Sequence, residues 1–220
     1  MKQAYSLISF LLLGGVNKIT MTKPFMIQDS FFKKAKALGY RARSAFKLLE
    51  IQEKYKIIQP KMCVLDVASA PGSFLQVIAK IVWNWGKVVW IDIQKIDPNF
   101  WFPNIHLLQE SIFEYDKIHA YICGLGISQF DCITSDIAPS TTGITWVDQY
   151  KSVELNLAIL DVAREFLKPG WTLILKVFVW EDIADLIQPI KEQYKKLSRM
   201  KPKACRDRSF EEYFICIDKK

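Results

Sequence analysis

Residues 64–74 read VLDVASAPGSF: an apolar run with one aspartate, then small residues, then a Pro-Gly pair. The apolar run predicts a buried strand, Pro71-Gly72 predicts a tight turn, and an apolar helical pattern begins at Ser73. In doubly wound α/β sheets, ligands bind at the carboxyl ends of the strands, where this turn would lie. The segment is therefore either a ligand-binding turn or an ordinary strand–turn–helix. Other segments of the sequence are needed to choose between these interpretations.

The composition of the turn restricts its ligand. A dinucleotide fingerprint uses several glycines so that the backbone can approach a pyrophosphate, whereas this turn has only Gly72. Pro71 has no N–H to offer a phosphate. The turn suits an uncharged or zwitterionic ligand such as S-adenosylmethionine, and it disfavours a nicotinamide-dependent oxidoreductase.

Strand-like and helix-like runs alternate along the chain, which predicts an α/β fold with a mostly parallel sheet and helices on both faces. We expect strands over residues 63–68, 87–92, 105–109, 130–135, 171–178, 196–200 and 212–218. We expect helices over 31–36, 44–55, 73–82, 114–122, 147–167 and 181–194, with Lys168-Pro169-Gly170 as a stop signal. A chain of 220 residues fits one domain, over residues 22–220.

Residues 1–21 are expected to be an extension outside the fold. Residues 6–16 are apolar but too short to span a membrane, and no clear small-residue cleavage site follows them. The segment lacks arginine, which argues against a mitochondrial presequence, and Met21 is an alternative start. Five cysteines without a CxxC pair, and two histidines, predict a reducing compartment and no metal site. We therefore expect a cytoplasmic protein, with a mitochondrial one as the alternative.

Lys176 is the first candidate for catalysis. It lies inside the apolar run Leu173–Phe178, where burial disfavours the charged form of an amine and makes it a usable base. The alternative is a lysine whose ammonium reaches water from a strand end.

Three other positions carry charge next to predicted elements. Asp136 ends a strand before Ile137-Ala138-Pro139 and is either a site carboxylate or a turn cap. Lys47 lies on an amphipathic helix, where a surface lysine is the alternative. Glu211 and Glu212 are neighbours on a strand and point to opposite faces, so only one can reach a given site. Periodicity leaves open which one.

Five segments together resemble the RrmJ/FtsJ (RlmE) family of ribosomal RNA 2′-O-ribose methyltransferases; they are 40–48, 64–74, 135–139, 173–178 and 209–213. The similarity runs from Asp29 to Lys219. The resemblance implies a Rossmann-like S-adenosylmethionine-dependent methyltransferase fold with seven strands, the last antiparallel. It also implies a catalytic tetrad, in which Lys176 removes the ribose proton and the others position it; the tetrad is Lys47, Asp136, Lys176 and Glu211.

S-adenosyl-L-methionine is the expected cofactor. Asp92 ends the second strand, where a carboxylate can accept hydrogen bonds from ribose hydroxyls. At the adenine position the family has an acidic residue after Gly, and this chain departs from that pattern with Glu110-Ser111. The residues expected to contact the cofactor are Asp66, Ala68, Ala70, Pro71, Gly72, Ser73, Phe74, Asp92, Glu110, Ser111 and Asp136.

RNA is the expected partner, because two basic clusters flank the candidate site. Residues 31–47 hold six basic and no acidic residues, and 191–208 hold eight basic and two acidic residues, within a net charge of +7. Solvated helix faces are the alternative. The expected RNA contacts are Lys33, Lys34, Arg41, Arg43, Arg199, Lys201, Lys203 and Arg206.

The expected reaction is 2′-O-methylation of a uridine in large-subunit (23S-type) ribosomal RNA. The alternatives are a tRNA methyltransferase or an inactive RNA-binding assembly factor on the same fold. We expect a monomer without stable membrane association.

Overall fold

The computed structural model describes residues 30–99, 102–140, 142–179, 183–206 and 209–220. The predicted extension over residues 1–21 lies outside these residues.

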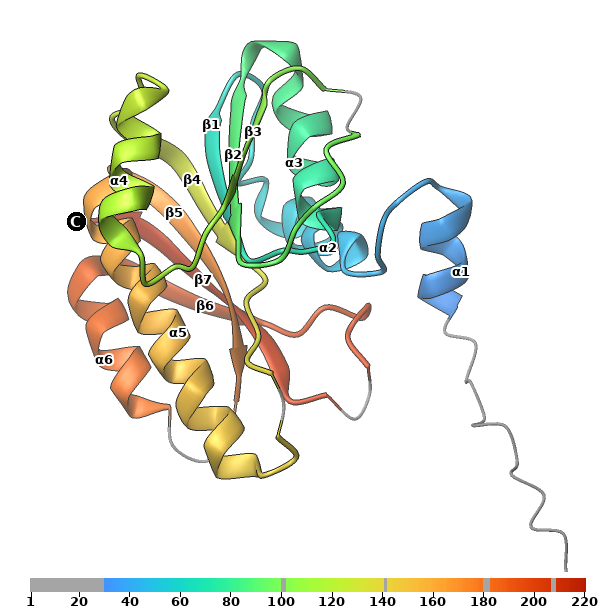
Figure 1. Ribbon diagram of the computed structural model, residues 1–220. Coiled ribbons are helices and arrows are strands. Elements are labelled where there is room, and N and C mark those ends of the chain that lie inside the picture. Colours follow the sequence, from blue (N-terminus) through green and yellow to red (C-terminus); the bar gives the residue numbers. More distant parts are fainter. Residues whose placement is uncertain (1–29, 100–101, 141, 180–182, 207–208) are drawn as a thin grey trace, which may run out of the picture.

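The fold is built on one seven-stranded sheet in the order β3-β2-β1-β4-β5-β7-β6 (Figure 1). Five strands are successive parallel neighbours, and β7 runs antiparallel between β5 and β6. This confirms the mostly parallel sheet and the antiparallel last strand. The strands are β1 Cys63–Val67, β2 Lys87–Asp92, β3 Ile105–Gln109, β4 Phe130–Ser135, β5 Leu167–Phe178, β6 Tyr194–Met200 and β7 Glu211–Lys219.

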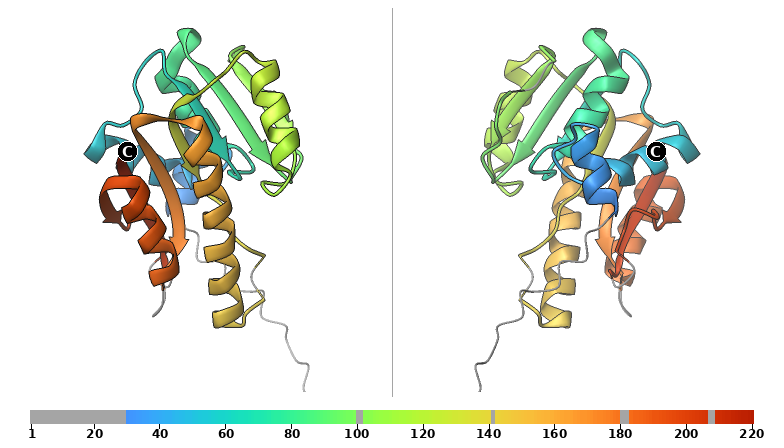
Figure 2. Two further views of the ribbon diagram at one scale, coloured as in Figure 1. Left: turned by 90° about the vertical axis from the view of Figure 1, so that its left-hand side faces the viewer. Right: turned by 90° about the vertical axis from the view of Figure 1, so that its right-hand side faces the viewer.

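Helices cover both faces of the sheet (Figures 1 and 2). Helices α4 (Tyr115–Gly124), α5 (Thr145–Phe166) and α6 (Ala184–Gln193) pack on one face. Helices α2 (Ala45–Tyr55) and α3 (Ser73–Val82) pack on the other. A short helix α1 (Ser30–Ala37) packs on α2, and a 3-10 turn η1 (Trp83–Trp85) follows α3.

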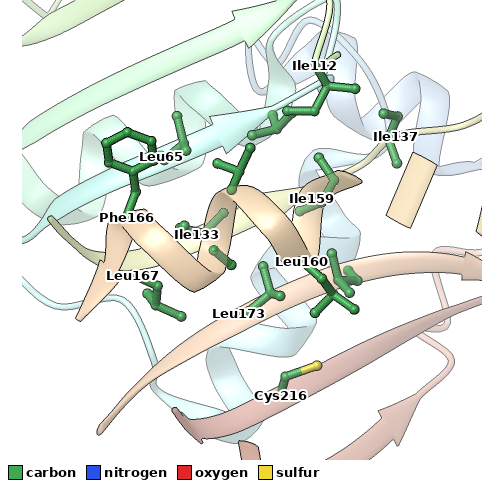
Figure 3. Close-up of a cluster of buried hydrophobic side chains, with 14 of the residues drawn as sticks. Leu65, Ile112, Ile133, Ile137, Ile159, Leu160, Phe166, Leu167, Leu173 and Cys216 are labelled. Carbon is green, nitrogen blue, oxygen red and sulfur yellow. The ribbon is translucent and has the colours of Figure 1, made fainter. Parts of the chain in front are cut away.

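Because side chains alternate along β1, the strand contributes residues to two apolar cores. Leu65 and Val67 belong to the core under α4, α5 and α6, whereas Val64 belongs to the core under α2 and α3. Figure 3 shows the first core, to which α5 contributes Ile159 and β4 contributes Ile133. Fully burying such a side chain contributes about 1.5–3 kcal/mol.

The boundaries differ from the sequence prediction mainly around β5. The helix expected to run to residue 167 ends at Phe166, and β5 begins at once at Leu167, paired with Phe130. Lys168-Pro169-Gly170, expected as a break between elements, lies inside β5 at an irregular register with β4. Gly170 has a left-handed φ of +82°, which allows an irregularity within the strand instead of ending it.

The topology opens a crevice at the carboxyl edge of the sheet. β1 is followed by α3 on one face, and its neighbour β4 is followed by α5 on the opposite face. The connections after β1 and β4 therefore diverge, which is the arrangement that creates a ligand site in open α/β sheets.

Candidate active site

A cavity of about 520 Å³ lies at this carboxyl edge. Its walls come from the connections after four parallel strands, from β5 and from the early turns of α5. The polar lining residues are Asp92, Gln94, Glu110, Ser111, Asp136, Ser140, Lys151, Glu154 and Lys176. The volume is that of a site for a small-molecule ligand.

The turn after β1 brings the backbone close to the cavity. Ala68 adopts φ +54°, a left-handed conformation that is uncommon for residues other than glycine. The Ala68 N–H donates to the carbonyl of Ile91 at 2.7 Å, and the Ala70 N–H donates to Asp92 Oδ2 at 2.9 Å. β2 thereby holds the turn in place. Ala68 and Ala70 both line the cavity, as expected of cofactor residues.

Asp66, an expected cofactor residue, lies beneath the turn and is not among the residues that line the cavity. Its side chain is fully buried on the same face of β1 as Val64. Its carboxylate accepts hydrogen bonds from the Thr134 hydroxyl at 2.8 Å and from the Ser69 hydroxyl. Burial raises the pKa of Asp66 to about 7. Asp66 therefore supports the turn from inside the core.

Asp66→Asn should remove a pH dependence of stability. The unfolded chain ionises this carboxyl near pH 4, but the folded protein does so only near pH 7. As the pH rises from about 4 to about 7, the free energy of unfolding of wild type should therefore fall by roughly 2–4 kcal/mol relative to that of Asp66→Asn. Above about pH 7 the difference should stay constant. Urea unfolding at pH 4.5, 6 and 7.5 measures this. Parallel stability profiles for the two proteins would contradict it.

The remaining turn candidates also lie outside the cavity lining. Ser73 and Phe74 are fully buried: the Ser73 and Ser44 hydroxyls lie 2.6 Å apart, and Phe74 stacks on Tyr213. Gly72 is buried, with φ +94° where α3 begins. Pro71 is exposed, and its carbonyl accepts from a guanidinium. These four residues shape the turn but do not line the cavity.

Asp92 is placed to accept from a ligand. Its two carboxylate oxygens accept the N–H groups of Ala70 and Gln94, each at 2.9 Å, and the residue lines the cavity while only 4% exposed. These bonds fix its orientation and leave each oxygen a further lone pair. An acidic group of this kind at the end of the second strand fits the ribose of a nucleoside.

Glu110 and Ser111 both line the cavity, but both carboxylate oxygens of Glu110 already have partners within the protein. Glu110 Oε1 accepts the Ser111 N–H at 2.9 Å, and Oε2 pairs with Lys117 at 3.0 Å. The hydrogen bond from the Ser111 N–H is the main reason that the pKa of Glu110 is lowered, and the contact with Lys117 is the second. The exposed ring of Phe113 extends the same wall and was missed by the sequence analysis.

Two buried ion pairs meet beside the cavity. Lys176 Nζ lies 3.0 Å from Asp136 Oδ1 and also donates to the Asp136 carbonyl. Lys47 Nζ lies 2.9 Å from Glu211 Oε1. Tyr213 connects the pairs: its hydroxyl donates to Asp136 Oδ1 at 2.6 Å, and its ring centroid lies 5.9 Å from Lys47 Nζ. The structure thus brings all four expected tetrad residues together.

The charges in this cluster stabilise one another. Burial alone would raise the pKa of Asp136, but Lys176, Lys47 and the Tyr213 hydroxyl together hold it below its ordinary value. Burial and the neighbouring Asp136 carboxylate raise the pKa of Tyr213 well above its ordinary value. Asp136 is therefore a carboxylate and Tyr213 a neutral donor at physiological pH.

Strand register decides which of the two adjacent glutamates reaches the cluster. Phe178 of β5 pairs with Glu211, and Val177 pairs with Glu212. Glu211 is buried against Lys47, whereas Glu212 points to the other face and pairs with Arg199 at 2.9 Å. The structure selects Glu211 from the two alternatives.

The two predicted basic clusters form one surface. Glu50 of α2 accepts the backbone N–H groups of Lys203 and Ala204 at 2.7 and 2.9 Å, which docks the loop after β6 against α2. Ala35 of α1 belongs to the same small core as Ala204. Several expected RNA contacts are exposed on this surface: Lys33, Lys34, Lys203 and Arg206.

The side chains of the other four basic residues donate hydrogen bonds within the protein. Arg41 donates to the carbonyls of Pro71 and Asn99 at 3.2 and 3.1 Å, so it connects the turn after β1 to the segment after β2. The remaining three also contact the protein: Arg43 donates to the Ala204 carbonyl, Arg199 pairs with Glu212, and Lys201 donates to the Ser209 carbonyl. Charge reversal at Arg41 would therefore disturb the cavity as well as the surface.

This fold and site define the class of S-adenosylmethionine-dependent methyltransferases. A family model for FtsJ-like methyltransferases matches residues 40–219. The chain belongs to the FtsJ-like methyltransferase family, and it is an S-adenosylmethionine-dependent RNA methyltransferase.

Curated relatives and a solved structure agree with this assignment. The Ribosomal RNA large subunit methyltransferase E of Methylobacillus flagellatus is 35% identical, covering 88% of this chain and 92% of that protein. The protein of the same name from Alkalilimnicola ehrlichii is 37% identical over 85% of this chain and 88% of that protein. A crystal structure described as a ribosomal RNA methyltransferase from Plasmodium falciparum has a TM-score of 0.72 and 28% identity, covering 82% of this chain and 98% of that chain.

Proposed function

We propose that this protein transfers a methyl group from S-adenosylmethionine to a ribose 2′-hydroxyl of large-subunit ribosomal RNA. The observation that carries the proposal is the pair of interlocked ion pairs, Lys176–Asp136 and Lys47–Glu211, beside the cavity. A surface lysine on a strand would not be 7% exposed and held by a carboxylate whose side chain is only 11% exposed.

The residues around the cavity fit S-adenosylmethionine. The small side chains of Ala68 and Ala70 leave room beside the turn, Asp92 can accept from the ribose hydroxyls, and Ile112 and Phe113 provide an apolar wall. When bound, the cofactor supplies an electrophilic methyl group on a sulfonium. The adenine contact that the family makes with an acidic residue would here fall to Ser111 and its neighbours.

Lys176 serves as the general base in this proposal. The Lys176 ammonium, which pairs with Asp136 in this structure, would first release a proton to solvent. The neutral amine would then take the proton of the 2′-hydroxyl as that oxygen takes the methyl group and the sulfonium becomes a neutral thioether. The Asp136 carboxylate, 3.0 Å away, stabilises the ammonium that forms. Lys47 and Glu211 hold the hydroxyl at the distance that the transfer requires, and Tyr213 fixes the orientation of Asp136.

Large-subunit ribosomal RNA is the substrate because the relatives above carry that name and the chain covers most of their length. The exposed basic surface near Lys47 and Glu211 would hold its phosphates. The test is to incubate the purified protein with labelled S-adenosylmethionine and either large-subunit RNA or tRNA, and then to map 2′-O-methylated nucleotides. Label in tRNA alone would contradict large-subunit RNA as the substrate but would still support the methyl-transfer reaction.

Charge reversal on the basic surface should weaken RNA binding. For Lys203→Glu/Arg206→Glu we expect about a tenfold loss of affinity near 0.1 M salt and a shallower salt dependence, because fewer counterions are released. Lys87→Glu/Lys195→Glu is the control, since it changes the net charge equally at the opposite, amino edge of the sheet. Both should bind S-adenosylmethionine like wild type. Equal losses in the two variants would show that only total charge matters.

No helix in the described part of the chain is long and apolar enough to cross a membrane. We place the activity in the cytoplasm, where its RNA substrate would be assembled. We infer that the protein acts as a monomer, because residues of one chain form both ion pairs of the proposed tetrad.

A further inference from the structure

The strand that carries Lys176 continues past its neighbour β4. β4 and β5 are paired only as far as Ser135 and Leu175, whereas β5 and β7 stay paired to Phe178 and Glu211. Lys176 is thus the first residue of β5 beyond the last β4 partner. The early end of β4 makes room for the cavity, but it removes the strand that would satisfy the backbone of β5 on that side.

Two polar side chains of α5 take the place of the missing strand. Asn156 Nδ2 donates to the Lys176 carbonyl at 3.1 Å, and the Phe178 N–H donates to Ser152 Oγ at 3.4 Å. Ser152 is 2% exposed and Asn156 is fully buried. Both bonds lie beyond Leu175, where β4 no longer pairs with β5.

Along the buried face of α5, the side chains change from polar to apolar near the end of β5. Ser152, Asn156, Ile159 and Ala163 follow one another on one face of the helix. Ile159 and Ala163 are core residues, and Ile159 faces the apolar cluster in Figure 3. The polar pair therefore occupies the part of this face that lies beside the end of β5.

Packing alone does not account for Asn156. Within the described residues its Oδ1 has no hydrogen-bond partner, so its burial costs free energy that an apolar side chain of similar size would not cost. Its amide does, however, bond to the main chain of the proposed base.

We propose that Ser152 and Asn156 are positioning residues that hold the β5 backbone around Lys176 in place of a strand. They keep Lys176 Nζ at Asp136 while the cavity beside it stays open. The catalytic part of this inference rests on the proposed function, and the structural part does not.

The structural part is tested by hydrogen exchange. Ser152→Ala should speed exchange of the Phe178 amide at least about tenfold, because that N–H loses its acceptor, and the Leu173 amide should not change. Ser152→Thr retains a hydroxyl and should restore protection. An unchanged Phe178 rate in Ser152→Ala would overturn the inference, whether or not the protein methylates RNA.

The catalytic part is tested with Asn156→Leu. We expect kcat to fall about tenfold, with unchanged KM and affinity for S-adenosylmethionine, because displacement of the base affects the chemical step. Ile159→Val, one turn further along the same helix face, is the control: it should lower stability but leave kcat unchanged. A kcat for Asn156→Leu within twofold of wild type would overturn the catalytic part.

The outcomes separate this inference from the proposed function. If wild type methylates no RNA, the proposed function fails, and the Phe178 exchange rates still decide the structural role. If wild type is active but Asn156→Leu does not fold, the kcat values of Ser152→Ala and Ser152→Thr decide. A loss in the alanine variant that threonine restores supports positioning, and equal activity in the two refutes it.

Discussion

Lys176→Ala should abolish methyl transfer while S-adenosylmethionine still binds. We expect kcat to fall about 10²–10⁴-fold, the range for loss of a general base. Cofactor affinity should be retained, because a lysine contributes no electrostatic attraction to a sulfonium. Single-turnover transfer to RNA and calorimetric titration of the cofactor measure the two quantities. Near wild-type turnover would refute the role of Lys176.

A second substitution separates base chemistry from charge. Lys176→Arg keeps a cation beside Asp136, but a guanidinium does not release its proton in proteins. It should therefore be as inactive as Lys176→Ala. Lys168→Ala is the matched control, because Lys168 pairs with Asp131 near the opposite end of the same strand. It should leave kcat unchanged. An active Lys176→Arg protein would assign Lys176 an electrostatic role instead.

Alternating strand-like and helix-like runs were sufficient to predict the sheet, whereas the charged cluster was predicted from the resemblance to a family; the fold explains why its members on the strands meet. Parallel strands end at the same edge, so the acidic or basic residues at their ends converge there. Asp92, Asp136 and Lys176 lie at the ends of β2, β4 and β5, and all three line the cavity. The resemblance to a family supplied what spacing could not, namely the joint choice of Lys47, Asp136, Lys176 and Glu211.

The position of Asp66 outside the cavity lining follows from strand alternation. Asp66 shares a face of β1 with Val64, and that face packs under α2 and α3, away from the cavity. An aspartate two residues before the turn is therefore directed into the core, where Thr134 and Ser69 satisfy it. The alternation was visible in the sequence, but the face of β1 that would lie toward the cavity was not.

Other site features depend on distances that no local pattern encodes. Lys151 and Glu154 reach the cavity because α5 begins at the open edge of the sheet, beside the ends of the strands (Figure 1). Arg41 reaches the carbonyls of Pro71 and Asn99, which are 30 and 58 residues away in the sequence. A basic run alone could not show that one of its members supports the cofactor turn.

Glu211→Gln and Glu212→Gln form a matched pair with opposite expected results. The two residues are adjacent and the change is the same, but only Glu211 is buried against Lys47 at 2.9 Å. Glu212 is more exposed and pairs with Arg199 on the other face. Loss of one partner of a buried ion pair leaves an uncompensated charge, whereas an exposed pair contributes about 0–1 kcal/mol.

For Glu211→Gln we therefore expect kcat to fall roughly 10–100-fold through misplacement of Lys47, while Glu212→Gln stays within about twofold of wild type. The unfolding temperature should fall for Glu211→Gln and hardly change for Glu212→Gln. Turnover is measured well below both midpoints, so that a kinetic loss is not an unfolding loss. Because alternation along β7 sends the two carboxylates to opposite faces, an inactive Glu212→Gln beside an active Glu211→Gln would mean that β7 pairs with β5 one residue out of register.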